Sequence, residues 1–271
     1  MSALSSAESA QQRHFDAFHA ARARTPLVSR LYAEAMGEAY PVEVDASSSA
    51  DWTLLGTMLA RLGLAPGQRL VDLGCGTGGV GLWLARALGV GLTGIDVSSV
   101  AVGLAAARRE AFVPPVRTEF RVGSLEGTGL PDAYAHGAVC VDAMGNAADR
   151  GAALRELRRI LVPGGRAVVT RAVRGTGEGA LREQAEEAGL VVEHVDVRPD
   201  EPAMWQRLYE LWLAHEEALR RDLGDVQAEN MLREARRVLP LLPSRRAYAL
   251  TLRRPGPALA PRPIGSRSRR R

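Results

Sequence analysis

A glycine-rich stretch preceded by an acid is the part of the sequence whose residue types and spacing indicate chemistry. Gly74, Gly76 and Gly79 fit the pattern G-x-G-x-x-G, in which glycines let a backbone turn lie close to a cofactor. Asp72 precedes this turn, where a carboxylate would repel a pyrophosphate but attract a cation. Cys75, a small residue inside the turn, is a candidate cofactor-binding residue together with Gly74 and Gly76. The stretch therefore favours a positively charged, phosphate-free cofactor, and S-adenosyl-L-methionine (SAM), with its sulfonium and ammonium groups, has these properties.

Further polar residues follow the next three predicted strands. Asp96 ends the second strand, where an acid accepts both ribose hydroxyls, and Val97 beside it can press on the adenine face. Ser124 and Leu125 follow the third strand and offer a hydroxyl and a backbone N–H to the edge of adenine. Asp142 follows the fourth strand, beside the position of the reactive methyl group. The four strand ends in order predict one SAM site.

The elements that position these residues alternate between strands and helices, as in a mostly parallel sheet covered by helices. After the glycine turn, apolar residues at helical spacing predict a helix that ends at Gly89. A second helix begins after Ser98 as its cap, and a third, through Leu161, ends at Pro163. Strands are expected at residues 69–72, 92–96, 117–122, 138–142, 166–170, 191–197 and 247–252. The expected fold is α/β.

Three segments differ in character from this centre. Residues 1–63 predict a helical N-terminal cap, in which Ser48-x-x-Asp51 resembles a capping box at the start of a helix. Residues 64–254 form the predicted SAM-binding domain, with a helical insert at 200–240 before the last strand. Residues 255–271, rich in proline and arginine with almost nothing apolar, predict a disordered tail.

The chain resembles the class I SAM-dependent methyltransferases between about Leu64 and Leu252. The resemblance rests on Val71-Asp72-Leu73-Gly74-Cys75-Gly76-Thr77-Gly78, Ile95-Asp96, residues 139–143 and Leu161-Val162-Pro163-Gly164-Gly165. It implies a Rossmann-like seven-stranded, mostly parallel sheet with helices on both faces, whose last strand runs antiparallel between the fifth and sixth. With the cap and the insert, the chain is similar to actinobacterial small-molecule methyltransferases of natural-product pathways.

Two departures from this family bear on the site. Many relatives carry Asp where Ser124 stands, and the run after the fourth strand, residues 142–146, has no histidine base. Candidate substrate-side residues are therefore His14, Tyr40, Glu43 and Asp142. The aromatic stripe Trp205, Tyr209 and Trp212 fits either the core of a helix layer or the wall of an acceptor pocket, and both interpretations stay open.

Composition excludes other chemistries. The 35 basic residues are all arginine, so a Schiff base, a pyridoxal phosphate lysine and a phosphate-binding loop lysine are ruled out. The two cysteines show no spacing for zinc, and no metal is expected. The sequence has no signal peptide and no apolar run of membrane-spanning length, so the expected location is the cytoplasm, without a membrane partner.

The sequence thus predicts a SAM-dependent methyltransferase that acts on O, N or C of a small hydrophobic or aromatic metabolite. One alternative is an NAD(P)-dependent oxidoreductase, which conflicts with Asp72 and with the absence of lysine. Another is a non-catalytic SAM-binding protein whose arginine tail contacts RNA, although no aromatic residue is interleaved with that tail for base stacking. The expected partner is a small-molecule acceptor rather than nucleic acid, and a homodimer is left open.

Overall fold

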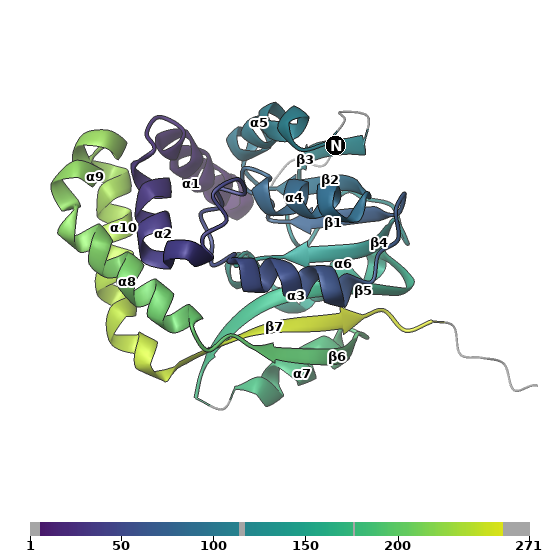
Figure 1. Ribbon diagram of the computed structural model, residues 1–271. Coiled ribbons are helices and arrows are strands. Elements are labelled where there is room, and N and C mark those ends of the chain that lie inside the picture. Colours follow the sequence, from purple (N-terminus) through teal and green to yellow (C-terminus); the bar gives the residue numbers. More distant parts are fainter. Residues whose placement is uncertain (1–5, 114–116, 176, 257–271) are drawn as a thin grey trace, which may run out of the picture.

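The structure, a computed structural model, describes residues 6–113, 117–175 and 177–256. Its centre is a seven-stranded sheet with the order β3-β2-β1-β4-β5-β7-β6 (Figure 1). Neighbouring strands are parallel except β7, which is antiparallel to β5 and β6. The strands are β1 (Arg69–Leu73), β2 (Gly91–Asp96), β3 (Thr118–Val122), β4 (Ala135–Cys140), β5 (Leu161–Arg174), β6 (Val191–Val197) and β7 (Arg245–Arg253). The expected sheet and its antiparallel last strand are confirmed.

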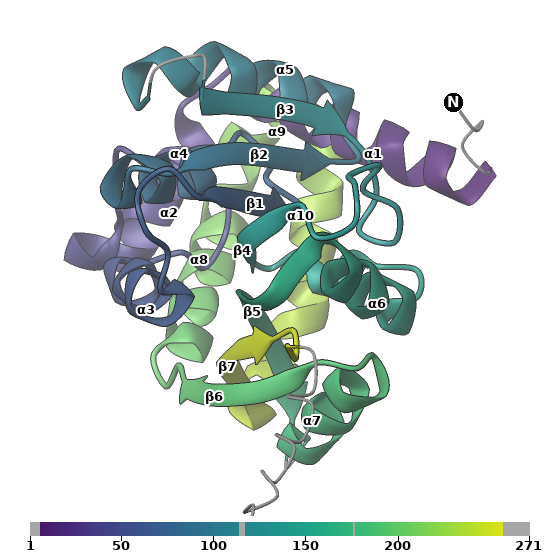
Figure 2. The same cartoon turned by 90° about the vertical axis from the view of Figure 1, so that its right-hand side faces the viewer.

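Helices cover both faces of this sheet (Figure 2). Because side chains alternate along a strand, β1 contributes to two cores: Leu70 packs with helices α3 and α4, whereas Val71 and Leu73 pack with α6 and α7. Helix α5 packs against β2 and β3. The bounds are α3 (Trp52–Leu62), α4 (Gly79–Leu88), α5 (Ser99–Arg108), α6 (Arg150–Ile160) and α7 (Glu178–Glu187). Burial on both faces explains why β1 is apolar apart from Arg69 and Asp72.

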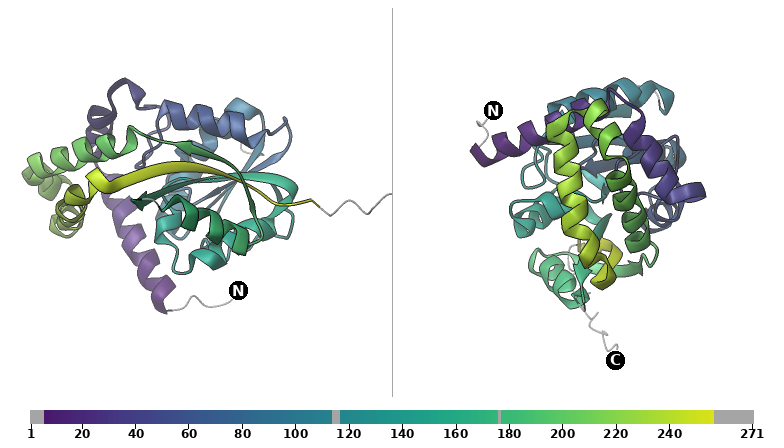
Figure 3. Two further views of the ribbon diagram at one scale, coloured as in Figure 1. Left: turned by 90° about the horizontal axis from the view of Figure 1, so that it is seen from below. Right: turned by 90° about the vertical axis from the view of Figure 1, so that its left-hand side faces the viewer.

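A third group of helices lies beyond the carboxyl ends of the parallel strands (Figures 1 and 3). It joins the two ends of the chain: α1 (Ser6–Arg22), α2 (Leu27–Met36), α8 (Glu201–Ala214), α9 (Glu216–Leu223) and α10 (Asp225–Val238). Leu31 and Tyr32 of α2 share an apolar core with Leu208 and Trp212 of α8. The N-terminal cap and the late insert therefore close over the same edge of the sheet.

Several local predictions agree with the structure. Gly89 ends α4 in the left-handed conformation, and the Ser98 hydroxyl accepts a hydrogen bond from the Ala101 amide at the start of α5. Two expected boundaries are wrong. Leu161 begins β5 instead of ending α6, because the Gly164 amide donates to the Arg254 carbonyl at 2.9 Å and extends the sheet.

The cap of α3 also differs from the prediction. Asp51, not Ser48, is the N-cap, and its Oδ1 accepts a hydrogen bond from the Leu54 amide at 2.6 Å. The Ser48 hydroxyl instead accepts from the Ala50 amide inside the preceding turn. The predicted tail, residues 255–271, lies outside the described residues from 257 onward. The division into cap, SAM-binding domain, insert and tail stays a prediction.

Candidate functional site

A cavity of about 990 Å³ lies between the carboxyl ends of the strands and the outer helices. Its size falls in the range of small-molecule sites, and it lies where ligands bind in open parallel sheets. Most predicted site residues line it, namely His14, Asp72, Gly74, Cys75, Gly76, Asp96, Val97, Ser124, Leu125 and Asp142. The topology therefore brings together residues that the sequence placed at the ends of four strands.

The glycine turn follows β1 and has left-handed backbone at two of the predicted positions. Gly74 has φ +71°, and its amide donates to the Ile95 carbonyl at 2.8 Å. A Cβ on Gly74 would lie 2.3 Å from the Cβ of Ala143, which follows β4. Gly76 has φ +52°. Residues with a side chain rarely adopt such angles, so the turn depends on glycine here.

Asp72 is buried at the end of β1. Its Oδ2 accepts a hydrogen bond from the Gly81 amide of α4 at 3.1 Å, which leaves Oδ1 without a partner among the described residues. Burial raises the pKa of Asp72 to about 7, and the negative charge of Asp96 adds to the shift. An acid with these properties is stabilised in its charged form by a cationic ligand beside it.

Asp96 is held in one orientation at the end of β2. Its Oδ2 accepts from the Gly76 amide at 2.8 Å, and its Oδ1 accepts from the Ser98 amide at 2.9 Å. Burial raises the pKa of Asp96, while these hydrogen bonds favour the ionised form. Each carboxylate oxygen keeps a second lone pair, so the pair of oxygens remains able to accept from two neighbouring hydroxyls.

The other residues predicted on this side line the cavity in less distinctive ways. The Ser124 hydroxyl accepts from the Gly127 amide at 3.1 Å, which fixes the turn after β3 beside Leu125. The Cys75 thiol is buried, and burial raises its pKa well above the ordinary value. A thiol kept protonated is not a nucleophile, so Cys75 acts as a small turn residue.

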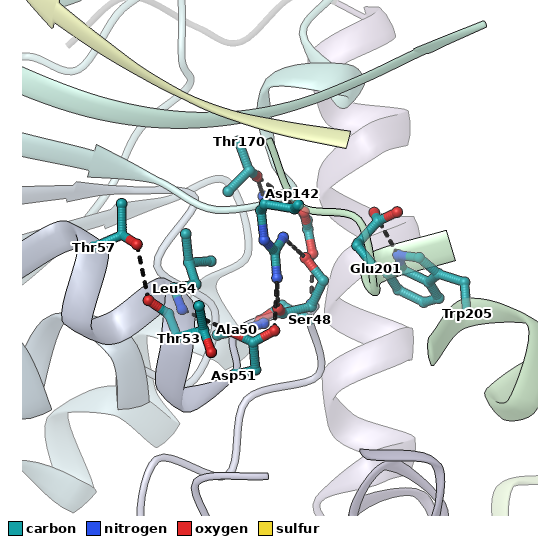
Figure 4. A network of polar contacts seen from close by, with 12 residues as sticks. Ser48, Ala50, Asp51, Thr53, Leu54, Thr57, Asp142, Thr170, Glu201 and Trp205 are labelled. Carbon is teal, nitrogen blue, oxygen red and sulfur yellow. Dashed lines mark hydrogen bonds and ion pairs between the residues drawn. The ribbon is translucent and has the colours of Figure 1, made fainter. Parts of the chain in front are cut away.

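Asp142 joins β4 to the segment before α3 (Figure 4). Its backbone is left-handed, with φ +55°. Its Oδ1 accepts from the Thr170 hydroxyl at 2.9 Å, and its Oδ2 accepts from the buried Ser49 amide at 2.6 Å. Arg198 donates to the Ser49 hydroxyl at 2.7 Å and to Asp51 at 3.2 Å. Asp142 thus links the segment around Ser49, through Oδ2, to Thr170 of β5, through Oδ1. A role in orienting an acceptor stays a prediction.

Replacing Asp142 by alanine is expected to lower the free energy of unfolding by about 1–3 kcal/mol, the cost of leaving a buried donor unsatisfied. The donor concerned is the Ser49 amide, in a residue with 0% exposure. Chemical denaturation measures the change. The control is Asp200→Ala, since the exposed Asp200 side chain makes no cap hydrogen bond at the start of α8. Equal stability of the two variants would contradict the assignment.

Two of the substrate-side predictions are wrong in their placement. Tyr40 is buried, but its hydroxyl donates to Asp45 at 2.9 Å outside the cavity. Glu43 points to the outside, where it accepts from the Trp83 indole at 2.8 Å and pairs with Arg86 at 2.6 Å. The Arg108 guanidinium holds the backbone carbonyls of this segment against the glycine turn, which leaves the Glu43 side chain on the surface. Neither Tyr40 nor Glu43 is therefore a candidate catalytic residue.

Helix α1 contributes cavity residues that sequence reasoning did not assign. Asp16 anchors the helix by accepting from the Ser98 hydroxyl at 2.6 Å and the Val100 amide at 3.1 Å. His19 lies beside the glycine turn, and burial, with the nearby positive charge of Arg22, lowers its pKa to about 4. His14, which remains a substrate-side candidate together with Asp142, also lies on this helix. Phe15, His19 and Arg22 recur at helical spacing. This shared helical face is the signal in the sequence that could have identified the cavity residues of α1.

The aromatic stripe of α8 fits both interpretations that the sequence left open, the core of a helix layer and the wall of a pocket. Tyr209 and Trp212 are 4% and 2% exposed and belong to the core of the outer helices. The same two rings and Trp205 also line the cavity. Trp205 stacks on Tyr209 with 5.4 Å between ring centroids, and Tyr32 of α2 meets Trp205 edge-on at 6.3 Å. This half of the cavity therefore has a rigid aromatic wall.

Residues 70–165 match the family described as "Methyltransferase domain". The matched segment contains the glycine turn, Asp72, Asp96 and Asp142. This segment of the chain is a methyltransferase domain. Among curated relatives, this domain is similar to an O-methyltransferase of Pyrenophora dematioidea, with 30% identity over 154 residues, 57% of this chain and 51% of the relative. It is also similar to the 27-O-demethylrifamycin SV methyltransferase of Amycolatopsis mediterranei, with 30% identity over 52% of each chain.

The chain spans about half the length of these curated relatives. Solved structures match over more of the chain. The [4+2]-cyclase SpnF has a TM-score of 0.69 and 25% identity, covering 85% of this chain and 93% of the other. The cyclopropane synthase MmaA2 from Mycobacterium tuberculosis has a TM-score of 0.67 and 16% identity over 89% and 98%. These likenesses confirm the fold. No helix among the described residues is long and apolar enough to cross a membrane.

Proposed function

We propose that the protein transfers a methyl group from SAM to an oxygen, nitrogen or carbon atom of a small hydrophobic or aromatic metabolite in natural-product biosynthesis. The observation that carries this proposal is the unit formed by Asp72, the glycine turn and Asp96 at the cavity. The comparisons with O-methyltransferases support it, and the oxidoreductase alternative is not favoured. In this proposal, residues 64–254 bind the cofactor. The N-terminal cap and the insert at 200–240, which belongs to that range, cover the cavity.

The residues at the strand ends fit SAM. Asp72 offers the unpaired Oδ1 to the ammonium side, and the glycine turn leaves room for the methionine part. Asp96 would hold the two ribose hydroxyls, while Val97, Ser124 and Leu125 would bound the adenine. When bound, SAM supplies an activated methyl group on its sulfonium. A dinucleotide fits poorly, because its pyrophosphate would face the Asp72 carboxylate.

The protein's own contribution to the reaction is mainly alignment. The hydrogen bonds of Asp96 fix the cofactor half, and the aromatic wall of α8 and α2 bounds the acceptor half. Orienting two reactants can supply about 7–11 kcal/mol of a barrier. His14 is the remaining candidate base, and a base adds about 10²–10⁴-fold. The absence of a histidine after β4 is therefore compatible with methyl transfer.

The affinity for SAM is expected to fall about tenfold per pH unit as the pH decreases below about 7. The reason is that Asp72 has a pKa of about 7 without ligand, and protonation removes the charge that attracts the cation. Asp96, whose pKa is also raised, shifts in the same direction. Calorimetric titration between pH 5.5 and 8 measures the effect. The Asp72→Asn variant is the control and is expected to give a flatter profile; an unchanged profile would contradict the role of Asp72.

Methyl transfer itself is tested with SAM that carries a labelled methyl group. The full chain is incubated with a panel of small aromatic and macrocyclic compounds that carry hydroxyl, amine or activated carbon groups. The proposal predicts a product that gains one labelled methyl, measured by mass spectrometry. A product of unchanged mass would instead indicate a reaction of the kind named for the similar cyclase. Such a product, or turnover that does not depend on SAM, would contradict the proposal.

A further inference from the structure

Three buried N–H groups in the cavity wall have no hydrogen-bond partner. They are Nε and Nη1 of Arg22 and Nε1 of Trp212. Thr251, within the sheet, has the one other such side-chain atom among the described residues. Buried polar groups in proteins are almost always paired, so each exception asks for an explanation. All three groups in the cavity are donors, and the missing partner is therefore an acceptor.

The charge of Arg22 narrows the chemistry of that partner. The guanidinium lies over the Phe18 ring, with Cζ 3.7 Å from the ring centroid, so one of its faces is covered. That contact leaves Nε and Nη1, in the plane of the group, without a partner, while the same side chain hydrogen-bonds Tyr32. Its neighbour His19 has a pKa of about 4 and is neutral at pH 7, so it does not balance the positive charge of Arg22. A buried guanidinium without a counter-ion is unfavourable. The missing hydrogen-bond partner of Arg22 is therefore expected to be an anion.

Other arginines of the same cavity show the contrast. Arg245 donates to the buried carboxylate of Glu201, with Nε 2.9 Å from Oε2. Arg198 pairs with Asp51 at 3.2 Å. Within the described residues, Arg22 makes no ion pair, although Glu234 lies near enough to influence its pKa. Arg198 and Arg245 thus have carboxylate partners, whereas Arg22 combines the lack of an ion pair with two buried N–H groups that have no partner.

The residues around the three donors are those of the aromatic wall. Arg22 interacts electrostatically with Tyr32 of α2, and the Tyr32 ring centroid is 6.5 Å from that of Trp212. Trp212 in turn meets Tyr209 edge-on at 5.2 Å. The donors therefore lie beside the aromatic wall, and His19, one helical turn before Arg22, lies beside the glycine turn.

We propose that Arg22 and Trp212 bind a carboxylate group of the acceptor substrate, whose apolar body lies against Tyr32, Trp205 and Tyr209. This inference rests on the proposed function and names the substrate class of the same site. A guanidinium presents parallel N–H groups that match the two oxygens of a carboxylate, and the indole N–H adds a third donor. The substrate is accordingly an aromatic or otherwise apolar acid, rather than a neutral or cationic metabolite.

The carboxylate of SAM is the other source of the same chemistry, and the test separates the two. The probes are naphthalene-2-carboxylate and its neutral carboxamide, titrated calorimetrically into the full chain saturated with S-adenosylhomocysteine. We expect the carboxylate to bind at least tenfold more tightly than the carboxamide. The Arg22→Met variant is expected to lose this preference, whereas Arg13→Met, on the exposed side of the same helix, keeps it.

Binding of S-adenosylhomocysteine distinguishes failure of this inference from failure of the proposed function. We expect Arg22→Met to bind S-adenosylhomocysteine within about twofold of the wild type, which also shows that the variant folds. If Arg22 instead holds the cofactor carboxylate, its variant loses affinity for S-adenosylhomocysteine but not for methylthioadenosine, which lacks that group. That result, or equal affinity of the wild type for the two naphthalene probes, would overturn the inference. Absence of S-adenosylhomocysteine binding by the wild type would overturn the proposed function.

Discussion

Replacing Asp96 by alanine is expected to weaken binding of SAM and S-adenosylhomocysteine about 100-fold, which corresponds to about 3 kcal/mol. The carboxylate would accept both ribose hydroxyls, and hydrogen bonds to a charged group contribute about 1.5–3 kcal/mol each. The substitution also removes the acceptor of the Gly76 and Ser98 amides, so the glycine turn loses one of its links to β2 and keeps the bond from the Gly74 amide to the Ile95 carbonyl. Isothermal titration calorimetry with the purified full chain measures the change.

The matched control for Asp96→Ala is Asp132→Ala. The Asp132 side chain is 79% exposed and pairs with Arg159 at the surface, away from the cavity. A surface ion pair of this kind contributes little, so binding is expected to stay within about twofold of the wild type. Affinity of Asp96→Ala equal to that of the control would contradict the ribose assignment, provided that both variants unfold cooperatively at similar temperatures.

Replacing Gly79 by alanine is expected to lower the free energy of unfolding by about 3 kcal/mol and to reduce cofactor binding with it. A Cβ at Gly79 would lie 1.8 Å from the Val44 carbonyl oxygen, a backbone atom that Arg108 also holds at 2.9 Å. A rigid backbone neighbour cannot rotate away, so the segment around Val44 must separate from the start of α4. Chemical denaturation and calorimetry on the same preparation measure both effects.

Gly103→Ala is the control for the change from glycine to alanine. Gly103 lies in α5, and a Cβ there would meet nothing within 4 Å. Alanine in open helix reduces the entropy of the unfolded chain, so a gain of about 0.4–1 kcal/mol is expected with unchanged cofactor affinity. If Gly79→Ala were as stable as Gly103→Ala, the close approach of Val44 to the glycine turn would be contradicted.

The fold could be predicted from sequence because its signals are local. The glycine turn, the Ser98 cap and the Gly89 stop each reflect the backbone needs of a few neighbouring residues, and the structure agrees with them. The α3 cap shows where local signals end. Ser48 and Asp51 are both good capping residues, and the choice depends on Arg198, which holds Asp51 from a position 147 residues away.

The candidate site divides in the same way. Asp72 and Asp96 could be placed because strand ends of a parallel sheet meet at one edge. The hydrogen bond between Asp142 and the Ser49 amide spans 93 residues and has no local signal. The position of Glu43 was predicted wrongly, because no residue near it in the sequence indicates that Arg108 donates a hydrogen bond to the Glu43 carbonyl. Arg22 was missed although a lone charge on an apolar helical face was visible, since its significance depends on the burial of its N–H groups.

A calorimetric titration of the wild-type chain with SAM and, separately, with NAD⁺ at pH 8 decides whether the site around Asp72 and Asp96 binds SAM. Asp72 is ionised at that pH, so the site is expected to attract the cationic cofactor and to exclude the pyrophosphate. We expect saturable binding of one SAM per chain and no binding of NAD⁺. Binding of NAD⁺ with equal or higher affinity, or no binding of SAM, would contradict it.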